Sequence, residues 1–346
     1  MKIFHNLYLS IISLENLFLS WEEFRIGKTK KPDVLEFGRH LEDNLFALHH
    51  ELKNKRYKHS DYTSFYITDP KVRHIHKALV KDRIVHHAIH RILYPIFDPA
   101  FIHDSYSCRI GKGTHRAVRR LGNFTRKVSK NYTGKCFVLK CDIRKFFASV
   151  DHEMLIELLE KKIKDEDLMR LIREIVGSFY LAIRESSLTS LGFPRERERE
   201  RERERGVPLG NLTSQLFANV YLNELDQFVK HDLRIKYYIR YCDDFVIVGD
   251  DEKDLEEICV KIKLFLEAKL RMELHPNKVE IRKLNQGIDF LGYVIKPHFS
   301  ILRTKTKNRM LKRICEKNLS SYLELLSHCN GYGLEEKIKG IVDLQK

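Results

Sequence analysis

The chain of 346 residues is long enough to bury a large core and to hold two or three subdomains. Its 63 Lys and Arg residues outnumber its 48 Asp and Glu residues, and the formal net charge of +15 favours a polyanionic partner, nucleic acid before an acidic membrane. The seven cysteines form no Cys-x-x-Cys pair, which argues against a zinc site or a disulfide framework and favours reduced thiols in the cytoplasm. No apolar run reaches membrane-spanning length, so we expect a soluble protein without a membrane partner.

Residues 1–60 have the periodicity of a helical N-terminal extension. The apolar stretch at residues 7–20 resembles a signal peptide, but Glu15 and Asn16 interrupt it and no small-residue cleavage site follows. It therefore predicts one amphipathic helix, followed by an exposed basic loop at residues 28–31. No catalytic pattern is visible in this segment.

Short strands are predicted at residues 65–67 and 72–75, with a turn at Asp69 and Pro70 and a helix from about Asp82. Basic residues cluster in this segment: Arg73, Lys81 and Arg83. They form either a solvated basic face or a clamp on a triphosphate, and charge alone leaves both possibilities open. A glycine-containing loop at residues 105–115 lacks Walker spacing, so it could contact a nucleotide or a nucleic-acid backbone.

Carboxylates mark the next two predicted strands. Residues 136–143 predict a strand that ends at Asp142, and Asp151 is placed to cap the helix after it. Two β-rich runs at residues 237–249 flank Asp243 and Asp244, which predicts a tight hairpin with both carboxylates at its bend. Adjacent anions are unfavourable unless a cation neutralises them, and carboxylate oxygens suit Mg²⁺. The alternative is a solvated acidic turn. A metal site is favoured instead if the two strands share a sheet, because Asp142 would then lie beside Asp243 and Asp244.

Residues 178–206 predict a low-complexity surface insertion, because residues 195–205 alternate strictly between Arg and Glu and have no apolar face. We assign this tract no function. Residues 206–215 then predict a turn that exposes backbone before a helix through about Leu233. This turn suits either close approach of a nucleic acid or an ordinary capped loop. After the hairpin, the pattern predicts a helix, strands at residues 278–284 and 288–295, and a basic helical tail from Thr304.

The order of these motifs resembles the palm of a reverse transcriptase. Residues 241–244 match the family's Tyr-x-Asp-Asp box, and Asp142 matches its first catalytic Asp. Five residues later, Phe147 matches the aromatic that blocks a ribose 2′-hydroxyl, and Lys278 resembles the lysine that protonates pyrophosphate. Two further groups correspond to family elements: the hairpin that grips the primer (Phe290, Leu291, Gly292 and Tyr293) and the basic fingers of group II intron-related enzymes (Arg73, Lys81 and Arg83). The resemblance covers roughly residues 60–330.

Residues 209–215 also resemble one subgroup. Their aliphatic-Gly-x-x-x-Ser-Gln pattern, with Leu209 and Gln215 at its ends, is similar to reverse transcriptases of diversity-generating retroelements. This resemblance implies error-prone copying at template adenines and a small basic accessory protein as partner. The competing hypothesis is a bacterial anti-phage defence enzyme whose synthesis is untemplated or protein-primed. A catalytically silent nucleic-acid binder is a third possibility, which the intact carboxylates oppose.

The family resemblance implies an α+β right-hand polymerase with fingers, a ferredoxin-like palm and a short helical thumb. We expect a helical extension at 1–60, fingers and palm at 61–298, and the thumb at 299–346, with no maturase or endonuclease domain after it. The enzyme would make cDNA from an RNA template, a DNA primer and deoxynucleoside triphosphates. Asp142 and Asp243 would hold two Mg²⁺ ions roughly 3.5–4 Å apart, with Asp244 as a supporting carboxylate.

Overall fold

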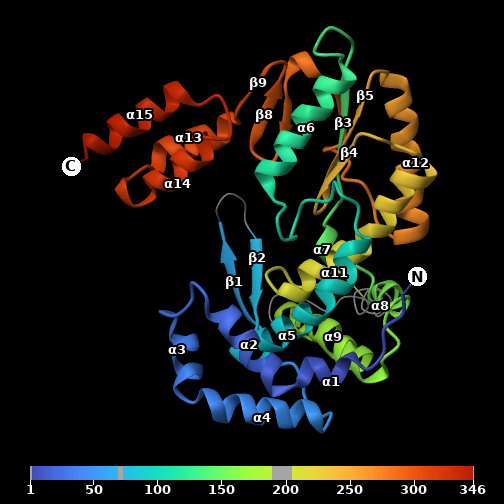
Figure 1. Ribbon diagram of the computed structural model, residues 1–346, viewed down its shortest axis with the longest axis vertical. Coiled ribbons are helices and arrows are strands. Elements are labelled where there is room, and N and C mark those ends of the chain that lie inside the picture. Colours follow the sequence, from blue (N-terminus) through green and yellow to red (C-terminus); the bar gives the residue numbers. More distant parts are fainter. Residues whose placement is uncertain (1, 69–72, 189–204, 346) are drawn as a thin grey trace. The chain divides into compact units, whose positions relative to one another are not determined.

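The computed structural model describes residues 2–68, 73–188 and 205–345 (Figure 1). Within these ranges the chain forms two compact units, each assembled from three separate stretches of sequence. The first unit takes its residues from 1–102, 144–226 and 266–273. The second takes its residues from 103–143, 227–265 and 274–346. Neither unit is therefore a continuous piece of the sequence.

The first unit is mainly helical. Its α-helices are α1 (Leu7–Ile12), α2 (Leu14–Arg25), α3 (Pro32–Arg39), α4 (Leu41–Lys53), α5 (Val80–Phe97), α7 (Phe146–Ser149), α8 (His152–Glu160), α9 (Glu166–Leu188) and α11 (Leu212–Gln227), whose last residue belongs to the second unit. A short 3₁₀ helix, Asp98–Ala100, follows α5. The single helix predicted over residues 7–20 is wrong, because Ser13 ends α1 and its hydroxyl caps α2 by accepting from the Asn16 amide at 3.2 Å.

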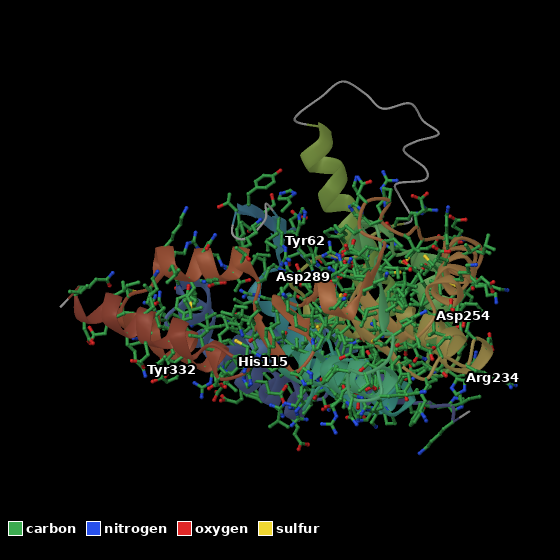
Figure 2. All side chains as sticks on the ribbon, turned by 90° about the horizontal axis from the view of Figure 1, so that it is seen from above. Tyr62, His115, Arg234, Asp254, Asp289 and Tyr332 are labelled. Carbon is green, nitrogen blue, oxygen red and sulfur yellow. The ribbon has the colours of Figure 1, made fainter. Side chains whose placement is uncertain are left out.

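A two-stranded antiparallel sheet completes the first unit. Its strands are β1 (Thr63–Ile67) and β2 (Arg73–Lys77), with Phe65 opposite Ile75. Just before β1, Tyr62 (labelled in Figure 2) lies 3.2 Å from the Ser178 hydroxyl and packs edge-to-face on Phe179. These contacts tie the start of the sheet to α9. The predicted turn at Asp69 and Pro70 lies outside the described residues.

The second unit contains a four-stranded antiparallel sheet in the order β4-β5-β3-β6. Its strands are β3 (Phe137–Asp142), β4 (Tyr238–Tyr241), β5 (Asp244–Gly249) and β6 (Glu280–Lys283). Figure 1 shows α6 (Thr114–Val128) on one side of these strands and α12 (Glu252–Leu270) on the other. The strands are therefore covered by helices, and most of their apolar residues are buried.

A second antiparallel sheet in this unit has the order β7-β8-β9, from β7 (Ile288–Phe290), β8 (Tyr293–Lys296) and β9 (Phe299–Leu302). The single strand predicted over residues 288–295 is thus a hairpin, because Leu291 (φ 49°) and Gly292 (φ 92°) turn the chain. The helices α13 (Thr304–Arg313), α14 (Glu316–Leu326) and α15 (Tyr332–Asp343) follow. They share one apolar core with α6 and both sheets.

Other predicted boundaries shift by a few residues. The helix after β2 begins at Val80 instead of Asp82. The helix predicted to reach Leu233 stays α-helical only to Gln227, and Phe228–Asp232 forms a π-helical turn. Residues 178–188 of the predicted insertion continue α9, whereas the rest of the Arg-Glu tract up to residue 204 lies outside the described ranges. None of the described helices has the length and hydropathy needed to span a bilayer.

Candidate active site

Three carboxylates meet at one end of the four-stranded sheet. Strand β3 pairs with β5 so that Asp142 lies opposite Asp244, and the Ile143 amide donates to the Asp243 carbonyl at 3.2 Å. Strand β4 pairs with β5 so that Tyr241 also lies opposite Asp244. The expected hairpin is present, but only Cys242 and Asp243 form its two-residue loop, and Asp244 is the first residue of β5.

Burial and mutual repulsion make these carboxylates difficult to ionise together. Desolvation, followed by the charges of Asp243 and Asp142, raises the pKa of Asp244 to about 6. The pKa of Asp243 is raised as well, mainly by burial, and the charge of Asp142 adds to that effect. Asp142 itself is only 8 % exposed. The sheet therefore holds three acidic side chains in a place that favours a compensating cation.

Lys278 supplies one such cation. Its ammonium donates to Asp142 Oδ1 at 2.7 Å. The loop that carries it is held to the end of β3, because the His275 amide donates to the Asp142 carbonyl at 2.7 Å and the Lys278 amide donates to the His275 carbonyl at 3.1 Å. The backbone of β3 thus positions both the carboxylate and the lysine that contacts it.

The donor set suits Mg²⁺, although the described residues do not form a closed cage. No three His, Cys, Asp or Glu side chains among them are grouped so as to hold a metal ion. Protein sites for Mg²⁺ usually offer only one or two carboxylates and leave the remaining positions to water and substrate phosphates. An open end of a sheet with Asp142, Asp243 and Asp244 fits this pattern.

A buried arginine that the sequence analysis missed supports the hairpin loop. Arg240 on β4 is fully buried, and its guanidinium donates to the Cys242 carbonyl at 3.2 Å. Cys242 has φ 56°, a left-handed conformation that costs energy for a residue with a side chain. The contact from Arg240 helps to hold this conformation. The only sequence signal was a charged residue inside a β-rich run, which reads equally well as solvent-exposed.

The loop at residues 105–115 has a structural role in the second unit. Its first residues run beside β4, where the Arg240 amide donates to the Asp104 carbonyl at 3.0 Å and the Tyr106 amide donates to the Arg240 carbonyl at 2.9 Å. Asp104 in turn accepts from Arg120 on α6 at 2.8 Å. The start of the loop therefore joins α6 to the edge of the sheet.

The residues matched to the primer-gripping hairpin occupy β7, β8 and their turn. Phe290 and Tyr293 each have 1 % of their surface exposed, and the Tyr293 hydroxyl donates to the Leu325 carbonyl at 3.0 Å. Leu291 and Gly292 form the turn between them. The two aromatic side chains therefore belong to the core, whereas the two turn residues are half-buried.

The residues predicted to contact the base pair and the sugar lie in the first unit, whereas the three carboxylates lie in the second. Phe147 on α7 is half-buried and packs edge-to-face on Phe146, with ring centroids 5.1 Å apart. Leu209 and Gln215 line a cavity of about 390 Å³, together with Arg83 among other residues. The structure thus brings three of the predicted substrate-binding residues to one cavity.

Two residues of the basic cluster already have carboxylate partners in the folded protein. Arg83 pairs with Asp33, and Lys81 lies 3.4 Å from a carboxylate oxygen of Glu51. Arg73 is exposed at the start of β2. Two of the three proposed triphosphate contacts would therefore have to exchange a protein carboxylate for a phosphate.

Comparison with known proteins identifies the family of this chain. Residues 62–295 match the family model described as "Reverse transcriptase (RNA-dependent DNA polymerase)". The group II intron-encoded protein LtrA of Lactococcus lactis subsp. cremoris is 25% identical over 366 residues, covering 87% of this chain and 56% of LtrA. Protein YkfC of Escherichia coli K12 is 25% identical over 286 residues, covering 72% of this chain and 70% of YkfC.

Among solved structures, an apo telomerase from Candida tropicalis aligns with a TM-score of 0.49 at 12% identity, covering 76% of this chain and 60% of that one. The chain spans about half the length of LtrA. The family model covers well over half of the present chain and includes all three carboxylates of the sheet. The chain therefore belongs to the reverse transcriptase (RNA-dependent DNA polymerase) family.

Proposed function

We propose that this protein is an RNA-directed DNA polymerase that extends a DNA primer on an RNA template. The observation that carries the proposal is the pairing of Asp142 with Asp244 across β3 and β5, with Asp243 in the adjoining loop. Family membership supports the same reaction. Deoxynucleoside triphosphates would be the substrates, and phosphoryl transfer of this kind depends mainly on positioning and charge neutralisation.

Asp142 and Asp243 would hold the divalent ions, with Asp244 as the supporting carboxylate. Two bound Mg²⁺ ions would neutralise charge on the reacting phosphates and lower the pKa of the primer hydroxyl. Lys278 would act as proton donor to the leaving pyrophosphate, since its ammonium already contacts Asp142 at 2.7 Å. Phe147 would exclude a ribose 2′-hydroxyl, and Leu291 and Gly292 would approach the primer through the hairpin turn.

In the first unit, Leu209, Gln215 and Arg83 would surround the nascent base pair and its triphosphate, with Arg73 and Lys81 as further phosphate contacts. Their support is the cavity that the first three line together. We also propose the right-hand arrangement of fingers, ferredoxin-like palm and helical thumb. All seven cysteines are free thiols, which is consistent with a cytoplasmic enzyme.

The subtype we propose is a diversity-generating retroelement enzyme, with a small basic accessory protein as partner. Its support is the aliphatic-Gly-x-x-x-Ser-Gln pattern at residues 209–215. An aliphatic Leu209 in the cavity cannot donate hydrogen bonds to a base pair, so discrimination there would rest on shape. Sequencing cDNA copied from a mixed-base RNA separates the alternatives. Errors concentrated at template adenines support the retroelement, whereas product made without template supports the defence enzyme.

Primer extension by the Asp243→Asn variant tests the polymerase assignment. Changes in the outer shell of metal sites alone cost 10–100-fold, so loss of a ligand charge is expected to lower incorporation by more than about 100-fold. The control is Asp250→Asn, which removes the same charge from an exposed residue just after β5. Wild-type rates in the Asp243→Asn variant, with Asp250→Asn also normal, would contradict the assignment.

A further inference from the structure

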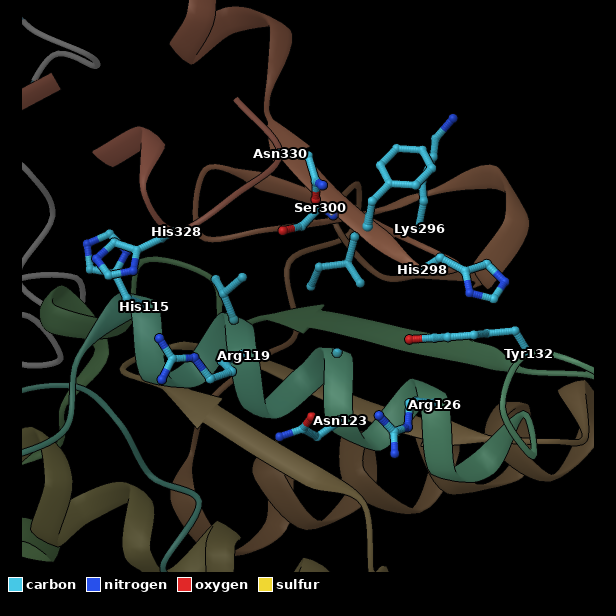
Figure 3. A pocket seen from close by; sticks show the side chains of 14 residues that line it. His115, Arg119, Asn123, Arg126, Tyr132, Lys296, His298, Ser300, His328 and Asn330 are labelled. Carbon is cyan, nitrogen blue, oxygen red and sulfur yellow. Dashed lines mark hydrogen bonds between the residues drawn. The ribbon is translucent and has the colours of Figure 1, made fainter. Parts of the chain in front are cut away.

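A basic groove lies in the second unit, away from the carboxylates. It encloses a cavity of about 280 Å³ between one face of α6, the strands β8 and β9, and the connection from α14 to α15. Figure 3 shows the residues that line it, and those labelled there include His115, Arg119, Asn123, Arg126, Lys296 and His328. Neither Lys278 nor any of the three carboxylates of the sheet lines it.

Among the described residues, the groove is lined by cations without ion-pair partners, and one carboxylate, Glu324, contacts its end through His328 at 3.3 Å. Arg119, Arg126 and Lys296 line it, and no Asp or Glu residue does. Within the described part of the chain, none of these three cations has an ion-pair partner. By contrast, Arg120 on the same helix pairs with Asp104 at 2.8 Å. Cations that outnumber the anions around a cavity favour an anionic ligand.

The spacing of the charges indicates an extended anion. Arg119 and Arg126 are seven residues apart on α6, which places them about 10 Å apart along the helix axis at 1.5 Å per residue. Lys296 belongs to the opposite wall, on β8. A single small anion would need these groups to converge on one point. Charges distributed along a groove instead match consecutive phosphates of a nucleic-acid backbone.

Aromatic rings stand at both ends of the groove. The rings of His115 and His328 stack with centroids 3.8 Å apart, and Tyr132 packs edge-to-face on His298 at 4.5 Å. The groove also offers polar side chains, among them Asn123, Asn330 and Ser300. Stacking rings beside basic residues are the usual combination in sites for single-stranded nucleic acid.

Hydrogen bonds hold the walls of the groove in place. The Ser300 amide donates to Asn330 Oδ1 at 3.2 Å, and the Asn330 amide donates to the Ser300 carbonyl at 2.7 Å. His115 Nδ1 lies 3.1 Å from the Tyr293 hydroxyl, which itself donates to the Leu325 carbonyl. The groove is thus preformed, so a ligand would not have to order it.

We propose that this groove binds the phosphodiester backbone of a single-stranded nucleic acid, as a second contact surface distinct from the catalytic carboxylates. Arg119, Arg126 and Lys296 would each contact phosphate oxygens. The paired rings at the two ends would stack on bases. The proposal rests on the proposed function only for the expectation that such a strand is present.

Fluorescence anisotropy of a labelled 20-nucleotide mixed-sequence RNA tests this proposal. Binding is measured with the full chain in chelator and without nucleotides, so the result does not depend on catalysis. The Arg119→Gln/Arg126→Gln double variant should bind at least about tenfold more weakly. The magnitude of its slope of log K against log salt should decrease by about 1.4, because each of the two lost phosphate contacts on a single strand contributes roughly 0.7.

The matched control is Lys127→Gln, because Lys127 is exposed on the same helix next to Arg126 but does not line the groove. Its affinity should stay within about twofold of wild type, and circular dichroism checks that all variants are folded. A DNA probe of the same sequence, measured in parallel, shows which nucleic acid the groove binds. Weaker binding of the double variant to RNA alone, or to both RNA and DNA, supports the proposal. Unchanged affinity and slope in the folded double variant would overturn it, as would displacement of RNA by polyglutamate at equal charge concentration.

Discussion

The substitution Asp244→Asn should stabilise the protein when no divalent ion is bound. Asp244 is half-buried at the start of β5, opposite Asp142 and next to Asp243. Asn has nearly the same shape but carries no charge. It therefore removes both the cost of burying a carboxylate and its repulsion from two neighbouring carboxylates, while the strand pairing is retained.

The magnitude follows from the pKa of Asp244, which rises from an ordinary 3.8 to about 6 in the folded protein. A shift of about two units corresponds to about 3 kcal/mol at 1.36 kcal/mol per unit. Because the folded state binds the proton more tightly, protonated Asp244 contributes about 3 kcal/mol to the free energy of unfolding of the wild type below about pH 4. The wild type loses this contribution as the pH rises through about 6. At pH 7.5 the Asn variant should be the more stable protein by up to about 3 kcal/mol.

Urea unfolding in chelator, at pH 4 and at pH 7.5, measures this difference. The two proteins should have similar free energies of unfolding at pH 4 and should diverge at pH 7.5. The control Asp250→Asn removes an exposed charge and should change stability by no more than about 0.5 kcal/mol at either pH. Equal or lower stability of the Asp244→Asn variant at pH 7.5 would refute the argument from repulsion.

Adding Mg²⁺ extends the test. An ion that binds only the folded state stabilises it in proportion to the logarithm of its concentration over its dissociation constant. The wild-type protein should gain stability on addition of Mg²⁺, and the Asp244→Asn variant should gain less. The difference in free energy of unfolding between the two proteins should therefore become smaller than in chelator, or change sign. An identical gain in both proteins would show that Asp244 does not contribute to ion binding.

Three further predictions concern residues of the first unit. Phe147→Ala should admit ribonucleotides, and an unchanged ratio in a ribo- against deoxynucleotide competition with folded protein would reject the sugar gate. Leu209→Gln should lower errors at template adenines, up to about tenfold for each 1.4 kcal/mol of discrimination gained, as counted by deep sequencing of cDNA. Asp151→Ala should reduce the free energy of unfolding by about 2–3 kcal/mol, because Asp151 caps α8 through the Met154 amide at 3.1 Å and pairs with Arg271 at 2.7 Å. Asp151→Asn, which retains a capping oxygen, should lose about half as much in denaturant unfolding.

Local patterns in the sequence were sufficient to predict the elements that carry the candidate site. A β-rich run ending in Asp142 and two runs flanking Asp243 and Asp244 correspond to β3, β4 and β5. Periodicity of apolar residues and turn chemistry act over a few residues, so they can be read without the fold. The cap at Asp151 was predictable for the same reason, since the side chain bonds to an amide three residues later.

Burial and pairing between distant segments were decided only by the tertiary structure. Arg240 reads as a surface residue in its strand, yet it is fully buried under the hairpin loop. Tyr293 matched a primer-binding motif, but its ring lies in the core with α6 and α14. The groove beside α6 was not predicted, because its other wall comes from β8, β9 and residues near His328, which are distant in the sequence. These features depend on which faces of distant segments pack together. The free energy that selects the packing comes from burying apolar surface of both segments, so the sequence of one segment alone does not determine the packing.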